Sequence, residues 1–209
     1  MNQIDTKTRI LDAAERLFAE NGIAATSLRA ITAAAGANLA AVNYHFQSKE
    51  ALIHACYSRR LGPANQKRLE MLDAAERRAG DGVPSLEEIV RAFAEPFLRD
   101  FMGQPFVALM GRMIIEPGDF AQRLLAAQMG EIARRFSAAM RRVLPGLPEE
   151  DMYWRMFFAV GVLAHTLAKG QLVEVVSQGR CRPGDIDAIV KRMVTFLCAG
   201  LRAETGGHA

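Results

Sequence analysis

A short polar and aromatic cluster near the N-terminus carries the clearest chemistry in this sequence. Tyr44 and His45 offer a phenol and an imidazole N–H, and each can donate to a phosphate oxygen. Lys49 follows in the first turn of an expected helix, whose unpaired backbone N–H groups also attract anions. Thr26 and Ser27 begin an earlier helix in the same way. These residues predict contacts with a nucleic-acid backbone. Their alternative roles are a solvated lysine, simple helix caps and packing of the aromatic rings.

Between these groups lies a segment whose outward residues are small or carry an amide. Asn is suited to adenine, and the methyl group of Ala is suited to the thymine methyl group in the major groove. The candidates for base contacts are Asn38, Ala40, Ala41 and Asn43. A plain surface role is the alternative interpretation for each of them.

Two very short helices about a tight turn are needed to present these side chains. Apolar residues recur at helical spacing on each side of the turn: Leu28, Ile31 and Ala35, then Leu39, Val42 and Phe46. Gly36 permits the left-handed conformation that a sharp turn often needs, and Asn38 can cap the second helix. This pattern predicts a helix-turn-helix whose second helix enters the major groove.

The remaining pattern is helical throughout, with no strand signal and no internal repeat. A first helix should run from about residue 6 to 21, and a fourth from Ser48 to about residue 78, with a possible break at Gly62-Pro63. We expect an all-α fold of about nine helices. Residues 1–50 would form the DNA-binding domain and residues 51–209 a helical effector-binding and dimerisation domain, linked by the fourth helix.

Several helix boundaries in the second domain carry specific signals. Ser85 with Glu88 forms a capping box, and Pro96 predicts a kink or an early end of the helix that follows. Pro148 should begin a long helix that reaches about residue 178, and Asp185 should cap the last one.

Composition describes a soluble globular protein but says little about partners. The chain has 209 residues, of which 50% are hydrophobic and 23% charged, and its net charge is only +3. No apolar run approaches the ~20 residues of a membrane helix, and no signal-peptide pattern opens the chain. Cys56, Cys181 and Cys198 are too few and too scattered for a disulfide framework or a zinc site. We therefore expect a reducing cytoplasm.

Enzymatic signatures are missing from the sequence. It contains no H-E-x-x-H, G-x-S-x-G, P-loop or G-x-G-x-x-G motif, and its four histidines show no ligand spacing. We expect no catalysis, no cofactor and no metal.

The first 50 or so residues resemble the TetR family of bacterial transcriptional repressors. The resemblance rests on RILDAAERLFAENG (9–22), TSLRAITAAAG (26–36) and above all NLAAVNYHFQSKEALI (38–53). It implies a three-helix DNA-binding unit and a divergent helical domain that dimerises and binds a small effector. It also implies that Tyr44, His45 and Lys49 contact phosphates of a palindromic operator.

Two later segments resemble the fatty-acid-responsive, PsrA-type members of that family. These are MYWRMFFAVG (152–161) and FLCAGLRAETG (196–206). The resemblance implies a small hydrophobic effector such as a long-chain fatty acid or its CoA thioester. Flexible Met and bulky Phe side chains suit such a site, with ordinary core packing as the alternative. The candidate pocket residues are Phe97, Phe101, Phe106, Met110, Met113, Phe136, Phe157 and His165.

The last two long helices supply a candidate dimer interface. Small residues at Gly161, Ala164 and Ala168 would permit close approach in the first of them. The last helix carries an apolar stripe, from which we expect Met193, Val194, Leu197 and Leu201 to meet the partner subunit. Packing of this stripe against its own subunit is the alternative.

Three functions remain open at this point. The first is an effector-released, homodimeric repressor. The second is a nonspecific architectural DNA-binding protein, and the third is a small-molecule binding protein without regulatory DNA binding. Sequence-specific binding that an effector weakens would separate the first from the others.

Overall fold

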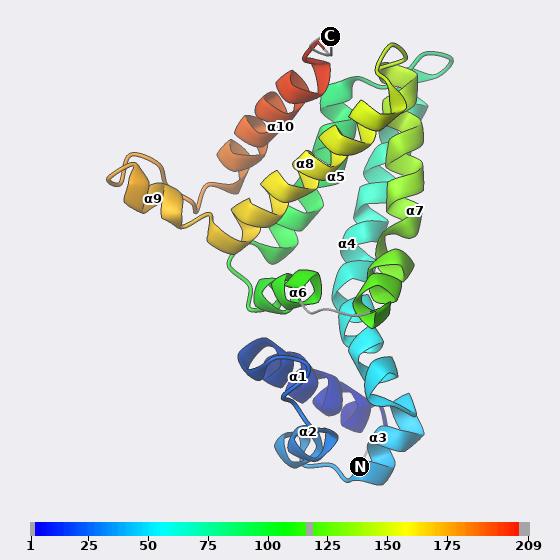
Figure 1. Cartoon of the computed structure of the whole chain (residues 1–209), viewed down its shortest axis with the longest axis vertical. Coiled ribbons are helices and arrows are strands. Elements are labelled where there is room, and N and C mark those ends of the chain that lie inside the picture. The colour runs from blue at the N-terminus through cyan, green and yellow to red at the C-terminus, as the bar shows by residue number, and fades with distance from the viewer. Residues whose placement is uncertain (1–2, 116–118, 205–209) are drawn as a thin grey trace. The chain divides into compact units, whose positions relative to one another are not determined.

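The computed structural model describes residues 3–115 and 119–204, and within these ranges the fold is all-helical, as expected (Figure 1). Ten helices lie in the described ranges: α1 (Gln3–Asn21), α2 (Leu28–Ala35), α3 (Leu39–Phe46), α4 (Lys49–Ala79), α5 (Leu86–Phe101), α6 (Phe106–Ile115), α7 (Asp119–Val143), α8 (Glu149–Lys169), α9 (Leu172–Val176) and α10 (Ile186–Arg202). None of the helices in the described part of the chain is both long and apolar enough to cross a membrane.

The helices form two compact units. The first contains residues 1–63 and 104–129, and the second contains residues 64–103 and 130–209. Helix α4 therefore contributes to both units, and α6 packs with the N-terminal helices although it lies far along the chain. The expected division into domains at residue 50 remains a proposal.

The first unit is built around α1, which contacts α2, α3 and α6. Its core consists of apolar side chains at helical spacing, among them Ile10, Ala14, Phe18, Ile31, Val42, Phe46 and Leu52. Tyr57 of α4 is fully buried and donates a hydrogen bond to the Leu109 carbonyl oxygen of α6, with an O–O distance of 2.7 Å. Burial of the ring together with its satisfied hydroxyl fixes α6 against α4.

Helix α4 is continuous through Pro63, and its span agrees with the prediction. The Ser48 hydroxyl accepts a hydrogen bond from the Ala51 N–H at 3.0 Å, which caps the helix where expected.

In the second unit, α10 packs mainly on α5 and also contacts α8. The expected capping box at Ser85 and Glu88 is present, and α5 continues through Pro96 as far as Phe101 instead of ending early. Asp185 caps α10 through the Ala188 N–H at 3.0 Å. Arg155 of α8 donates to the carbonyl oxygens of Leu201 and Ala203 at 2.8 and 2.7 Å. A cation at the C-terminal end of α10 also complements the dipole of that helix.

One boundary was predicted wrongly. The helix expected from Pro148 to about residue 178 ends at Lys169, and a separate short helix, α9, accounts for the tenth element. The chain turns at Gly170, where a Cβ atom would lie 2.5 Å from the Thr166 carbonyl oxygen. The β-branched residues that follow, such as Val173 and Val175, also favour a helix only weakly.

Candidate nucleic-acid interface

Helix α3 presents a small, mostly polar outer face. Asn38 is its N-cap, because the Asn38 Oδ1 accepts a hydrogen bond from the Ala41 N–H at 2.8 Å. Ala40 and Asn43 are exposed, Ala41 is half-buried, and the inward side is held by Val42 and Phe46. The Asn43 side chain can therefore approach a base edge, whereas the oxygen of Asn38 is already engaged in capping.

Leu39 departs from the expected inward placement. Its side chain is 43% exposed, because the first residue of α3 lies directly after the cap and no preceding turn covers it. This residue was missed as a functional candidate. Its methyl groups lie next to Ala40 on the outer face, and they can contact a thymine methyl group.

The turn before α3 depends on Gly36. It has a φ of 57° and caps α2, donating its N–H to carbonyl oxygens at the end of that helix. A Cβ atom here would also lie 3.4 Å from an Arg9 nitrogen. The left-handed conformation expected for Gly36 is therefore confirmed, and it sets the sharp turn between the two short helices.

Tyr44 and His45 end α3 with their rings packed edge to face, 5.1 Å between centroids. Tyr44 is 71% exposed, so its ring lies at the surface where a phosphate can approach it, and His45 is half-buried. An exposed aromatic ring that carries a donor at the edge of a helix-turn-helix is suited to contact the DNA backbone.

Thr26 and Ser27 have separate roles at the start of α2. Ser27 is the exposed N-cap, and its hydroxyl accepts from the Ala30 N–H at 3.1 Å. Thr26 is only 3% exposed, and its hydroxyl lies 2.7 Å from the Gly22 carbonyl oxygen and 3.2 Å from that of Leu17. The phosphate contact expected from the Thr26 side chain is therefore corrected, because its hydroxyl ties α2 to the end of α1.

Lys49 is half-buried at the start of α4. Its ammonium group donates to the Ile23 carbonyl oxygen at 2.6 Å, which holds the loop between α1 and α2. An ammonium group has three donors, so this bond leaves others for a phosphate. The phosphate contact of Lys49 remains a prediction.

A cluster of charged side chains joins α1 to α4. Glu15 is 8% exposed, and its two oxygens accept from the Nε atoms of Arg59 and Arg60 at 2.9 and 3.0 Å. Arg59 also pairs with Asp12 at 2.8 Å. Nearby, burial raises the pKa of the Cys56 thiol to about 12, and Glu15 adds to this increase. The cluster is structural, and Cys56 is an inert core residue.

Three of the expected effector-pocket residues gather in the second unit. Phe97 and Phe101 of α5 and Phe136 of α7 are buried, and the half-buried Phe93 of α5 packs against Phe136. The ring centroids of Phe97 and Phe101 lie 5.0 Å apart, and those of Phe93 and Phe136 lie 5.6 Å apart. We refer to Phe93, Phe97, Phe101 and Phe136 as the aromatic cluster.

The other expected pocket residues do not join the aromatic cluster. Phe106 is buried in the first unit beside Tyr57, and Met110 is half-buried on the same helix. The Met113 side chain lies outside the described residues. Phe157 is 66% exposed on α8, because it faces outward from the helix. His165 lines an open groove of about 850 Å³ among α8, α9 and α10.

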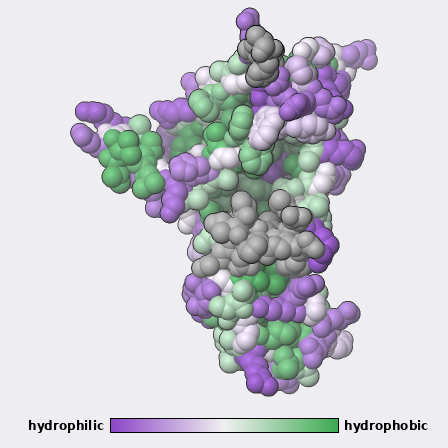
Figure 2. All heavy atoms as spheres, in the orientation of Figure 1, coloured by the Kyte–Doolittle hydropathy of each residue, from purple (hydrophilic) through white to green (hydrophobic). Residues whose placement is uncertain are grey.

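Exposed apolar side chains of α9 line part of that groove. Leu172, Val173, Val175 and Val176 of α9 are 45–83% exposed, and Figure 2 shows a hydrophobic patch at the left of the view where Figure 1 places α9. Four cationic residues also line the groove, namely Lys169, Arg180, Arg182 and Arg192, with one acid, Asp185.

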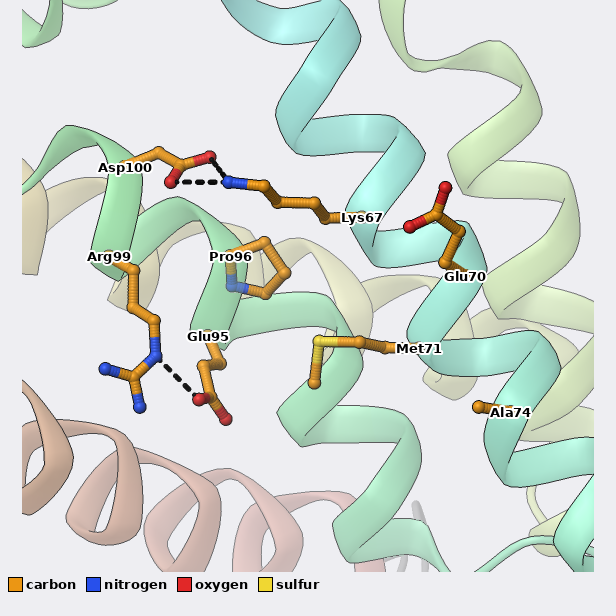
Figure 3. A pocket seen from close by; sticks show the side chains of 8 residues that line it. All are labelled: Lys67, Glu70, Met71, Ala74, Glu95, Pro96, Arg99 and Asp100. Carbon is orange, nitrogen blue, oxygen red and sulfur yellow. Dashed lines mark hydrogen bonds and ion pairs between the residues drawn. The ribbon is translucent and has the colours of Figure 1, made fainter.

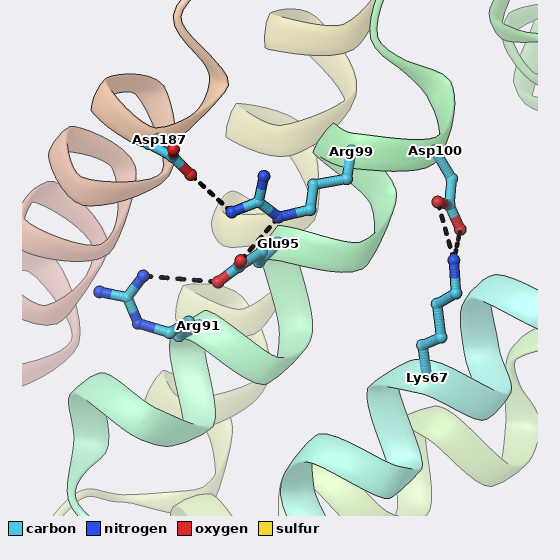
Figure 4. Close-up of polar contacts among 6 residues, drawn as sticks. All are labelled: Lys67, Arg91, Glu95, Arg99, Asp100 and Asp187. Atoms are coloured by element: carbon cyan, nitrogen blue, oxygen red, sulfur yellow. Dashed lines mark hydrogen bonds and ion pairs between the residues drawn. The ribbon is translucent and has the colours of Figure 1, made fainter.

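A smaller groove of about 290 Å³ runs between α4 and α5 (Figure 3). Most of its charged residues form ion pairs, whereas Glu70 accepts a hydrogen bond from Gln66. Lys67 donates to both Asp100 oxygens at 2.9 Å, and Glu95 lies between Arg91 and Arg99 (Figure 4). Arg99 reaches Asp187 of α10 at 2.5 Å, which links α5 to α10.

The structure divides the expected dimer residues into two groups. On α8, Gly161 and Ala168 are exposed and Ala164 is half-buried, and their place in a dimer interface stays a prediction. On α10, Met193, Val194, Leu197 and Leu201 are each 6% exposed or less. That part of the expectation is corrected, because the stripe packs inside its own subunit, in a helix whose main neighbour is α5. The outer face of α10 instead presents Phe196, which is 65% exposed.

An exposed aromatic stripe also lies on α8. Trp154, Phe157 and Phe158 are 53–66% exposed and recur with Gly161 at helical spacing. Their rings contact one another, with centroids 5.9–6.4 Å apart. Contiguous exposed sets of large apolar side chains are typical of protein, membrane or ligand interaction sites.

Two family models match the chain. Residues 10–56 match the model of bacterial regulatory proteins of the tetR family, and residues 87–200 match the model of the tetracyclin repressor-like C-terminal domain. The second match covers more than half of the chain.

Similar proteins are known from sequence and from structure. The HTH-type transcriptional regulator UidR of Escherichia coli (strain K12) is 46% identical over 50 residues, which is 24% of this chain and 26% of UidR. The chain thus matches about a quarter of that relative's length. NalD, the secondary repressor of the MexAB-OprM multidrug efflux pump in Pseudomonas aeruginosa, superposes with a TM-score of 0.65 at 20% identity, over 95% of this chain and 98% of NalD. The fatty acid degradation regulator FadR from Bacillus halodurans gives 0.61 at 16% identity, over 95% and 97%. At these identities the two structures show the fold alone.

Proposed function

The chain belongs to the TetR family of bacterial transcriptional regulators, and from this premise we propose that it is a homodimeric cytoplasmic repressor of a palindromic operator, released by a small hydrophobic effector. Family members bind operator DNA and act as dimers.

The observation that carries the DNA-binding role is the outer face of α3. A helix capped by Asn38 exposes Leu39, Ala40, Asn43 and Tyr44, while its inner side is buried against α1 and α2. Small and amide side chains read base edges, and Tyr44, His45 and the N-terminus of α2 at Ser27 meet phosphates on either side.

The exposed face of α8 and α10 supports the dimer. Trp154, Phe157, Phe158 and Gly161 of α8 and Phe196 of α10 lie outward, and α8 contacts α10 in the same unit. Two copies that meet through this face would form a four-helix, two-fold interface. A closed two-fold dimer places two recognition helices on half-sites about 34–36 Å apart.

Effector release would then be a population shift. A ligand that binds better to a dimer with mismatched recognition helices favours that state by its difference in affinity. Helix α6 connects the effector-binding unit to the DNA-binding unit along the chain. It packs in the DNA-binding unit, whereas α5, which precedes it in sequence, belongs to the other unit.

A long-chain fatty acid or acyl-CoA is the effector class that we propose. Support comes from the aromatic cluster and from the PsrA-type segments 152–161 and 196–206, of which residues 205–206 lie outside the described structure. FadR is a regulator of fatty acid degradation, whereas NalD is a repressor of a drug efflux pump, so the shared fold alone does not select an effector.

A mobility-shift titration tests the proposal. A long-chain fatty acid, or its CoA thioester, should release the protein from operator DNA at about micromolar concentration, within ordinary ligand affinities. A saturated alkane sulfonate of equal length controls for detergent effects. Release by a polar or planar aromatic compound, with acyl chains inert, would contradict the proposed effector class.

A further inference from the structure

One arginine in the second unit is buried without a counter-ion. Arg68 of α4 is 2% exposed, and its guanidinium carbon lies 3.3 Å from the centroid of the Phe97 ring and 4.6 Å from that of Phe93. Its one hydrogen bond among the described residues runs from Nη1 to the Asn65 Oδ1 at a long 3.4 Å. The buried Nε has no acceptor.

Cationic side chains close to Arg68 differ from it, because they form ion pairs with acidic side chains. Lys67, one residue earlier, takes both oxygens of Asp100, and Arg135 of α7 pairs with Asp73 and Glu76 at 2.5 and 3.1 Å. Asp100, Asp73 and Glu76 thus form ion pairs with these other cations. In the described part of the chain, no acidic side chain forms an ion pair with Arg68. Burial accordingly lowers the pKa of Arg68 to about 9, so that the group is still charged at neutral pH.

The free edge of Arg68 has the geometry of a carboxylate receptor. In a guanidinium group, Nε and Nη2 point to the same side and form a flat pair of donors that matches the two oxygens of a carboxylate. Asn65 engages the other side through Nη1. The stacked Phe97 ring covers one face of the group, so an anion must approach along the Nε edge.

The guanidinium group of Arg68 lies against aromatic rings. Phe97 and Phe93, which lie against the guanidinium, are each in contact with a further ring, Phe101 and Phe136, to form the aromatic cluster. A single buried cation that lies against two rings of the aromatic cluster suits one anionic group attached to a hydrocarbon body. The phosphates of a CoA thioester would need several cations, and the thioester itself has no carboxylate.

We infer that Arg68 binds the carboxylate of a hydrophobic free acid, whose hydrocarbon part packs among the aromatic cluster. This inference deepens the proposed function and rests on its effector-responsive second unit. Binding supplies the counter-ion that Arg68 lacks, so the acid should be favoured over a neutral molecule of the same length and shape.

The test compares dodecanoic acid with dodecan-1-ol by isothermal titration calorimetry on the full-length protein. We expect wild type to bind the acid at least about tenfold more tightly, in the range of a hydrogen bond to a charged group. Arg68→Met should remove this preference and leave binding of the alcohol unchanged or improved. The matched control Lys67→Met removes an exposed cation one residue away and should leave both affinities unchanged.

Thermal unfolding of the same variants excludes a folding defect. Arg68→Met should melt at or above the wild-type temperature, because the uncompensated charge is removed. Equal affinity of wild type for the acid and the alcohol, binding of neither, or an acid preference retained by Arg68→Met would each overturn the inference.

A mobility shift on the same samples separates this inference from the proposed function. If the acid binds through Arg68 but leaves the DNA complex intact, the inference stands and effector release fails. If the acid releases wild type and Arg68→Met equally, release stands and the role of Arg68 fails.

Discussion

At the scale of single residues, α3 divides its exposed side chains between two tasks. Asn43 carries both a donor and an acceptor toward a base edge, whereas the Tyr44 hydroxyl can meet a phosphate, which is the same in every sequence. The two residues are adjacent on α3, so variants at these two positions can be compared directly.

Asn43→Ala should weaken operator binding by about 1–3 kcal/mol, the discrimination that one amide–base pairing provides, with little change on random DNA. Tyr44→Phe keeps the ring and removes only the hydroxyl, so it should weaken both complexes equally, by about 0.5–1.5 kcal/mol for one hydrogen bond. Fluorescence anisotropy on matched duplexes measures both. Loss of discrimination in Tyr44→Phe, with unchanged affinity for random DNA, would show that the assignments are reversed.

Arg68 makes a prediction about stability and pH. Its folded pKa lies below the unfolded value, so the unfolded state holds its proton more tightly, and the cost of the buried charge is fully present below about pH 9. Arg68→Met should therefore raise the free energy of unfolding at pH 7 by about 1–4 kcal/mol. This advantage should shrink as the pH rises above 9, because folded wild type then loses the proton. Urea unfolding at pH 7 and pH 10 measures the difference, and an advantage that grew with pH would contradict this prediction.

The sequence predicted some of these single-residue features and missed others. The cap at Asn38 and the turn at Gly36 follow from local chemistry, and the structure shows both. Burial of Thr26 could not be predicted, because it depends on where the end of α1 lies, and the inward placement expected for Leu39 was wrong because helical spacing does not show which residues at a helix start lack a covering turn. Arg68 gave no sequence signal, since a charged residue within a helix is ordinarily solvated.

At the scale of elements, the contact of α1 with α4 depends on Glu15. Replacement by Gln keeps the volume but leaves Arg59 and Arg60 without their shared carboxylate. Since these arginine side chains are 28% and 50% exposed, we expect a loss of about 1–3 kcal/mol rather than the full cost of a buried pair. Glu20→Gln, which breaks the exposed pair with Arg16 on the same helix, should cost less than about 0.5 kcal/mol. Equal losses in denaturant unfolding would show that the cluster is not structural.

Helix ends illustrate what periodicity can and cannot predict. The capping box at Ser85 and the cap at Asp185 were predicted because each depends on residues within one turn. The end of α8 was missed, because the space at Gly170 is limited by Met102, whose Cε atom would lie 2.7 Å from a Cβ atom there, and this residue is far away in sequence. The apolar stripe of α10 was identified correctly, but its partner was not, since periodicity does not distinguish an intramolecular neighbour from a second subunit.

At the scale of the whole molecule, two substitutions separate the fold from the dimer. Phe157→Glu places a charge on the exposed face of α8 and should give a folded monomer with at least about tenfold weaker operator binding, because each half-site alone binds weakly. Val194→Asp buries a charge in the core and should unfold the second unit. Sedimentation velocity and circular dichroism distinguish these outcomes. A Phe157→Glu variant that stayed dimeric would rule out this face as the interface.

Sequence-specific recognition by a two-fold dimer is the property on which the proposed function depends most. Selection of binding sites from random DNA duplexes at physiological salt, followed by sequencing, tests this directly. We predict enrichment of a palindrome whose half-site centres are about 10 base pairs apart, or a multiple of that spacing. Tight binding without any enriched sequence would instead indicate an architectural DNA-binding protein, and no binding at all would indicate a ligand-binding protein.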